Sequence, residues 1–198
     1  MRKDVDHYFE GYEKRTVLKE NGKEKTDFVY VGNYFRIDTD KAGLKRINAV
    51  VIAAPVIFIG LFIAAGVMHS LGNTYGWTGL VSMIMLIPAV YWVIGSVRFV
   101  TAGEYMESRK VYYGHGRILR SLGAVWVFSI IQLIAEIISV IVQHYKLTNI
   151  PLEIGFTAIL AAECALVYFF RRFINRIEID DVGKVPYRKS TLSGTSSE

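Results

Sequence analysis

Long apolar segments alternate with short polar ones along the chain, and this pattern is the strongest signal in the sequence. Four segments are apolar enough to cross a hydrocarbon core of about 30 Å, which takes roughly 20 helical residues. None of the four contains Lys or Arg. The sequence therefore predicts an all-α membrane protein, a four-transmembrane-helix bundle with a small N-terminal β-hairpin segment. The predicted spans are about 47–70, 78–97, 121–143 and 150–170.

Composition and charge add an orientation to this plan. Hydrophobic residues make up 52% of the 198 positions, and the charged residues gather outside the spans. Lys and Arg number 11 before the first span, five between the second and third, and six after the fourth, so 22 of the 23 lie on one side. Because such residues in short loops stay in the cytoplasm, we expect a multi-pass protein of the cell membrane with both termini cytoplasmic. The positive surplus fits an anionic inner leaflet, and we expect no nucleic-acid partner.

The segment before the first span carries its own pattern. In KRTVLKENGKEKTDFVYVGNYFRID, two β-prone runs flank Asn21-Gly22, a dipeptide that accepts the positive φ values of a two-residue hairpin turn. An isolated hairpin is marginal in water, so this one should rest on the membrane surface, on the middle loop or on a partner strand. We expect a cytoplasmic segment with a β-hairpin at 1–46, a transmembrane domain at 47–173 and a flexible cytoplasmic tail at 174–198.

One apolar run carries polar residues at helical spacing. In SIIQLIAEIISVIVQ, residues 129–143, the polar positions follow one another at steps of three and four, which keeps them on one side of a helix. Unpaired polar groups in hydrocarbon cost several kcal/mol each, so this polar seam must face another helix, a second copy of the protein or a water-filled path. The seam is about 21 Å long. It consists of Ser129, Gln132, Glu136, Ser139 and Gln143.

Acidic and small residues define the fourth span. Glu163 lies near its middle, and together with Glu136 it gives two intramembrane carboxyl groups with no cation in any span. This combination indicates proton or cation handling, although the two acids need not share a site. A seam of small residues on the same helix suits close helix packing. The small residues are Gly155, Ala158, Ala162 and Ala165. A second, more polar face of the fourth span could meet the polar seam of the third span instead, and it consists of Glu153, Thr157, Ala161, Cys164 and Tyr168.

Motifs for other chemistry are absent from the sequence. It has no phosphate-binding glycine loop, no HExxH and no GxSxG, so we expect neither an enzyme nor a bound cofactor. The single Cys164 excludes a cysteine metal cluster. A set of His69, Glu136 and His144 at the outer surface is conceivable as a metal or proton-entry site, but its spacing is irregular and we predict no metal.

The leader YFEGYEKRTVLKENGKEKTDFVYVGNYFRID followed by four spans resembles uncharacterised four-span integral membrane proteins of Gram-positive bacteria. That resemblance implies no function. The plan is also similar to the small multidrug exporters, but here the acids come late in the chain and the leader is longer.

The sequence alone is compatible with two functions. The first is a non-enzymatic membrane subunit or scaffold in the lipid bilayer, homo-oligomeric or part of a larger complex, whose third span packs through the polar seam. The alternative is a small proton- or cation-coupled transporter or ion pathway that uses Glu136, with or without Glu163.

Overall fold

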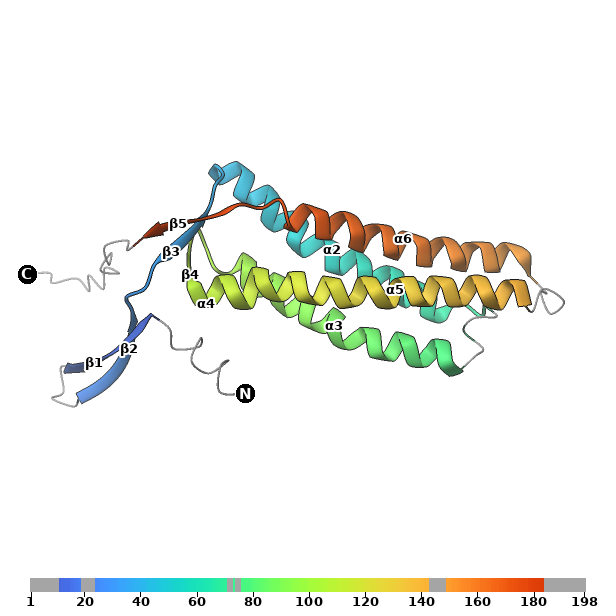
Figure 1. Ribbon diagram of the computed structural model, residues 1–198, viewed down its shortest axis with the longest axis horizontal. Coiled ribbons are helices and arrows are strands. Elements are labelled where there is room, and N and C mark those ends of the chain that lie inside the picture. Colours follow the sequence, from blue (N-terminus) through green and yellow to red (C-terminus); the bar gives the residue numbers. More distant parts are fainter. Residues whose placement is uncertain (1–10, 19–23, 71–72, 74–75, 143–148, 184–198) are drawn as a thin grey trace, which may run out of the picture.

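Four long helices lie side by side as a bundle, and short strands gather at one end of it (Figure 1). This computed structural model describes residues 11–18, 24–70, 73, 76–142 and 149–183. We call the end with the strands the sheet end and the opposite end the far end. The helices are α2 (Lys41–Val67), α3 (Gly76–Val100), α4 (Ser108–Val111), the π-helix η2 (Tyr112–Gly116), α5 (Arg117–Val142) and α6 (Ile150–Ile174). The strands are β1 (Tyr12–Leu18), β2 (Glu24–Tyr30), β3 (Tyr34–Ile37), β4 (Tyr105–Glu107) and β5 (Ile179–Gly183).

The four predicted spans are present as helices that are long and apolar enough to cross a membrane. Around the bundle, α3 contacts α2 and α5, while α6 contacts α5 and α2. Asp40 caps the start of α2, because its Oδ1 accepts a hydrogen bond from the Gly43 amide at 2.7 Å. The third helical stretch extends from Ser108 to Val142. It begins well before the predicted start at residue 121, because its first turns are polar and hydropathy alone does not assign them to a span.

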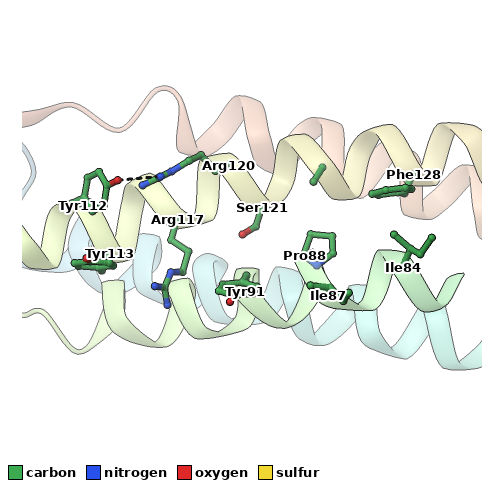
Figure 2. A pocket seen from close by; sticks show the side chains of 11 residues that line it. Ile84, Ile87, Pro88, Tyr91, Tyr112, Tyr113, Arg117, Arg120, Ser121 and Phe128 are labelled. Atoms are coloured by element: carbon green, nitrogen blue, oxygen red, sulfur yellow. Dashed lines mark hydrogen bonds between the residues drawn. The ribbon is translucent and has the colours of Figure 1, made fainter. Parts of the chain in front are cut away.

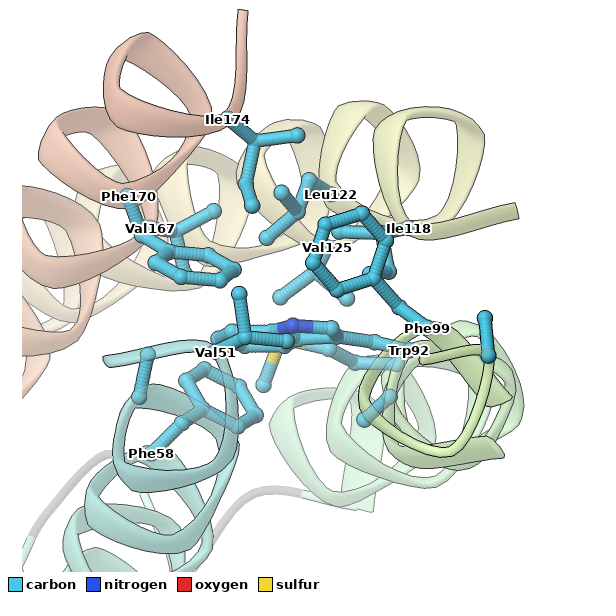
Figure 3. Close-up of a cluster of buried hydrophobic side chains, with 14 of the residues drawn as sticks. Val51, Phe58, Trp92, Phe99, Ile118, Leu122, Val125, Val167, Phe170 and Ile174 are labelled. Atoms are coloured by element: carbon cyan, nitrogen blue, oxygen red, sulfur yellow. The ribbon is translucent and has the colours of Figure 1, made fainter. Parts of the chain in front are cut away.

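An aromatic stack ties three helices together in the core. The ring of Trp92 on α3 lies 5.4 Å from that of Phe58 on α2 and 5.4 Å from that of Phe170 on α6 (Figure 3). Trp92 is fully buried. Such aromatic pairs contribute about 0.5–1.5 kcal/mol each beyond the burial of their area. The stack therefore fixes how α2, α3 and α6 are rotated about their axes.

A three-stranded antiparallel sheet collects three distant parts of the chain at the sheet end. Strand β3 lies in the centre, with β4 from the middle loop on one side and β5 from beyond α6 on the other. Ile37 pairs with Ile179 and is itself buried. Residues 179–183 were expected in a flexible tail and instead form β5, because a short strand is stabilised by the edge it joins and carries little pattern of its own. The rest of that tail, 184–198, lies outside the described residues.

The predicted hairpin strands are present, and they rest on the middle loop. β1 and β2 pair antiparallel from Tyr12 opposite Tyr30 onwards, while the predicted turn residues lie outside the described part of the chain. The Tyr12 hydroxyl donates to Glu107 Oε2 at 2.5 Å, and the Tyr30 hydroxyl accepts from the Ser108 amide at 3.1 Å. Burial, reinforced by the bonded Glu107 carboxylate, raises the pKa of Tyr12 to about 12. Tyr12 therefore stays a hydrogen-bond donor throughout the neutral range.

Candidate functional site

The polar seam of α5 is buried inside the bundle. Its side chains are only 1–5% exposed at Ser129, Gln132, Glu136 and Ser139. These positions face α3 and α6 of the same chain, whereas the apolar Ile137, Ile138 and Ile141 of α5 are exposed. Four of the five seam residues thus meet helices of their own chain, and Gln143 lies outside the described residues.

Hydrogen bonds connect the seam to α3. Gln132 Nε2 donates to Ser82 Oγ at 3.1 Å, and the Ser129 hydroxyl donates to the sulfur of Met85 at 3.5 Å. Ser139 turns inward to a carbonyl of its own helix one turn earlier, at 2.9 Å. Polar contacts between membrane helices contribute about 0.6–2 kcal/mol each, so these links help to hold α5 against α3.

Glu136 of α5 meets Glu153 of α6. The exposed fractions are 1% for Glu136 and 7% for Glu153, and the two carboxyl groups are close enough to interact with each other. Both lie near the far end, because Glu136 is six residues before the end of α5 and Glu153 is three residues after the start of the antiparallel α6. In a low-dielectric interior, ionising both of two neighbouring carboxyl groups costs more than ionising either one alone.

A hollow near the far end is lined by Glu153 of the pair but not by Glu136. Its volume is about 380 Å³, and it lies between the last turns of α5 and the first turns of α6. Apart from Glu153 and Thr157 its lining is apolar. The lining residues are Val140, Ile150, Glu153, Ile154, Thr157, Ala158 and Ala161.

Glu163 stands apart from this pair. It is fully buried in the inward stripe of α6, between Leu160 and Val167, and lies ten residues or about 15 Å of helix from Glu153. Neither of its carboxyl oxygens has a hydrogen-bond partner among the described residues. The structure therefore brings Glu136 together with Glu153, which the sequence placed on the alternative face of the fourth span, and keeps Glu163 separate.

The seam of small residues on α6 lies mostly on the outside of the bundle. Ala158, Ala162 and Ala165 are exposed. At Gly155 an added Cβ would lie 3.4 Å from Met68 Cε, which is ordinary van der Waals contact with the end of α2. Close packing of another helix on the three alanines would need a second chain, and it stays a prediction.

No group of three or more His, Cys, Asp or Glu side chains is arranged to hold a metal ion in the parts of the chain described above. His144, one member of the set considered from the sequence, lies outside those parts. His115 of η2 instead has its Nε2 3.2 Å from the Ile174 carbonyl, which the imidazole N–H can satisfy at the end of α6.

The arrangement suits the holding and exchange of a proton, since a carboxyl group, an amide and hydroxyl groups lie along one side of α5 and a second carboxyl group faces them from α6. The sequence identified the α5 side of this site and offered the Glu153 face of α6 as an alternative face toward it, but it could not choose between the two faces of α6, because the rotation of α6 has no local signal. Comparisons with known protein families, with curated proteins and with solved structures give no match to this chain.

Proposed function

We propose that this protein is a small multi-pass membrane protein that binds and releases a proton at the Glu136–Glu153 pair and couples this step to proton or cation passage. Four apolar helices fit a multi-pass membrane protein. The single observation that carries the proposal is the meeting of two buried carboxyl groups from α5 and α6. Ionisable residues at membrane depth are costly, and they mark ion and proton pathways more often than packing contacts.

The chemistry follows from the closeness of the two carboxyl groups. With one proton between them, a small rotation of the side chains would let one group donate a hydrogen bond to the other, and this bond would hold α5 against α6. When that proton leaves, two negative charges face each other in a low-dielectric interior and repel strongly. A cation or a returning proton relieves this repulsion. The pair is therefore a site where proton loss and cation binding, or helix separation at the far end, are linked.

The surroundings support a route in both directions. Toward the far end, the hollow of about 380 Å³ lies directly beside Glu153. Toward the sheet end, the polar line continues through Gln132, hydrogen-bonded to Ser82, and through Ser129. Glu163 is the next buried acidic group in that direction. These groups are spaced along the bundle so that water entering between them would complete a proton path.

Proton flux into liposomes tests the proposal. Purified protein should collapse an imposed pH gradient, while Glu136→Gln and Glu153→Gln should each leave the gradient as stable as in empty liposomes. Gln keeps hydrogen-bonding capacity but cannot release a proton. Glu104→Gln makes the same atomic replacement outside the bundle, where Glu104 forms an exposed ion pair with Arg36 at 3.1 Å, and it should keep full flux.

The second candidate is a membrane subunit or scaffold, which the exposed Ala158, Ala162 and Ala165 favour as a surface for another helix. The same preparations separate the two functions when their assembly is followed by crosslinking through the half-buried Cys164. If neither the unaltered protein nor Glu136→Gln moves protons and both crosslink alike, the seam is structural and the scaffold reading holds.

A further inference from the structure

A groove on the side of the bundle combines cations at one end with apolar walls at the other. It encloses about 650 Å³ between α3 on one side and η2 with the first half of α5 on the other (Figure 2). Arg117 and Arg120 lie at its sheet end together with tyrosine rings. The apolar part extends toward the middle of the bundle and is lined by Ile84, Ile87, Pro88, Ala124 and Phe128.

Tyrosine rings hold both guanidinium groups in place. The guanidinium carbon of Arg117 lies 5.4 Å from the ring centre of Tyr91 and 5.3 Å from that of Tyr113. Arg120 lies 4.5 Å from the ring centre of Tyr112 and donates to its hydroxyl at 3.2 Å. Stacking on a ring uses the face of a guanidinium and leaves N–H groups at its edge, which is the geometry that suits a phosphate.

The charge of the groove is unbalanced. Its lining contains two arginines and no acidic residue. Within the described ranges no carboxylate forms a salt bridge with Arg117 or Arg120. An anionic group entering at this end would therefore meet two cations that share no other counter-charge among those residues.

The apolar half has the length and exposure of a site for an acyl chain. From Arg120 to Phe128 the helix rises about 12 Å. Ile84 and Ile87, on the facing helix, are 41% and 62% exposed, so the wall opens sideways to the surface that would meet lipid tails. A soluble phosphate compound would leave this half empty, whereas a phospholipid would fill both halves at once.

We propose that this groove binds a phospholipid with a net negative headgroup, from the leaflet at the sheet end of the bundle. The phosphate contacts Arg117 and Arg120, and one acyl chain lies along Ile84, Ala124 and Phe128. Because the groove holds two cations and no acid, an anionic headgroup is favoured over a zwitterionic one. The site is separate from the Glu136–Glu153 pair and does not depend on the function proposed for it.

Native mass spectrometry of the delipidated protein in detergent tests the site. Dioleoyl-phosphatidylglycerol, dioleoyl-phosphatidylcholine and glycerol phosphate are the three probes. Each arginine near an anionic lipid contributes on the order of a fivefold change in affinity, so the double substitution Arg117→Gln with Arg120→Gln should weaken phosphatidylglycerol binding roughly 30-fold. The matched control is Arg171→Gln with Arg172→Gln on α6, where both arginines also lie over aromatic rings but outside the groove. That control should retain binding within about twofold.

A second variant tests the groove itself. Ala124→Trp keeps both arginines but fills the apolar half, and it should also abolish phosphatidylglycerol binding. Retained binding in Ala124→Trp, or equal binding of phosphatidylcholine by the unaltered protein, would overturn the proposal. Glycerol phosphate that binds as tightly as phosphatidylglycerol would show a soluble anion site instead of a lipid site, and it would overturn the proposal as well.

Discussion

Glu136 and Glu163 are both fully buried, but their surroundings differ. Glu136 faces a second carboxyl group, whereas Glu163 lies in an apolar stripe. The carboxyl oxygens of both residues have no hydrogen-bond partner in the described residues. The sequence predicts an inward polar seam because residue spacing alone decides which side of a helix a group occupies. It offers the face of α6 that carries Glu153 as one of two that could meet this seam, but it cannot choose between them, since the choice depends on how α5 and α6 are rotated and shifted against each other.

The substitution Glu163→Met tests how much stability the bundle loses by burying the Glu163 carboxyl group. Met has a similar size and needs no hydrogen bond, so removing a buried polar group without a partner should stabilise the bundle by about 1–3 kcal/mol. Thermal unfolding in detergent measures the effect, with Leu160→Met as an apolar control that should change stability by less than about 1.5 kcal/mol. Lower stability of Glu163→Met would show that the carboxyl group has a favourable partner after all.

At the scale of elements, long periodic segments are predictable and short dependent ones are not. All four apolar helices follow from the hydropathy of the sequence, and the hairpin strands follow from β-prone runs around a turn dipeptide. Strand β5 and the π-helix η2 do not. The strand exists because β3 offers it an edge, and η2 lies where the chain passes very close to α3 at Gly114. Both depend on contacts between segments far apart in sequence.

Gly114→Ala tests the close approach of η2 to α3. An added Cβ would lie 3.1 Å from Phe99 Cα and 3.2 Å from its amide nitrogen, and backbone atoms yield little. We expect a loss of about 1–3 kcal/mol in unfolding free energy, as for other overpacked sites. Gly123→Ala on α5 is the matched control, because no atom lies within 4 Å of its added Cβ. It should stabilise the helix by up to about 1 kcal/mol, and equal losses in both variants would contradict this account.

At the scale of the whole molecule, the sheet joins the leader, the middle loop and the segment after α6 at one end of the bundle (Figure 1). The distribution of Lys and Arg in the sequence predicts the same grouping and adds that this end is cytoplasmic. This grouping can be predicted because Lys and Arg are retained on the cytoplasmic side in each short loop separately, so each loop can be assigned to a side from its own residues. The side of the membrane needs its own experiment.

Cysteine labelling in intact cells tests that side. In a Cys164→Ala background, single cysteines at Asp38 and Glu178 should react with an impermeant maleimide only after the membrane is opened. A cysteine at Asn73, at the far end, should react without opening. Labelling of Asp38→Cys and Glu178→Cys from opposite sides would contradict the bundle itself, because β3 and β5 lie in one sheet. Labelling of both in intact cells would reverse the predicted orientation.

The shared proton of the Glu136–Glu153 pair is the central claim, and infrared spectroscopy of the carboxyl C=O stretch tests it most directly. In one hydrogen-bonded pair, replacing either member changes the band of the other. We therefore expect Glu136→Gln and Glu153→Gln each to remove or shift the same protonated carboxyl band, while Glu104→Gln leaves it unchanged. If Glu153→Gln leaves that band as it is in the unaltered protein, the two groups do not share a proton and the proposed site is wrong.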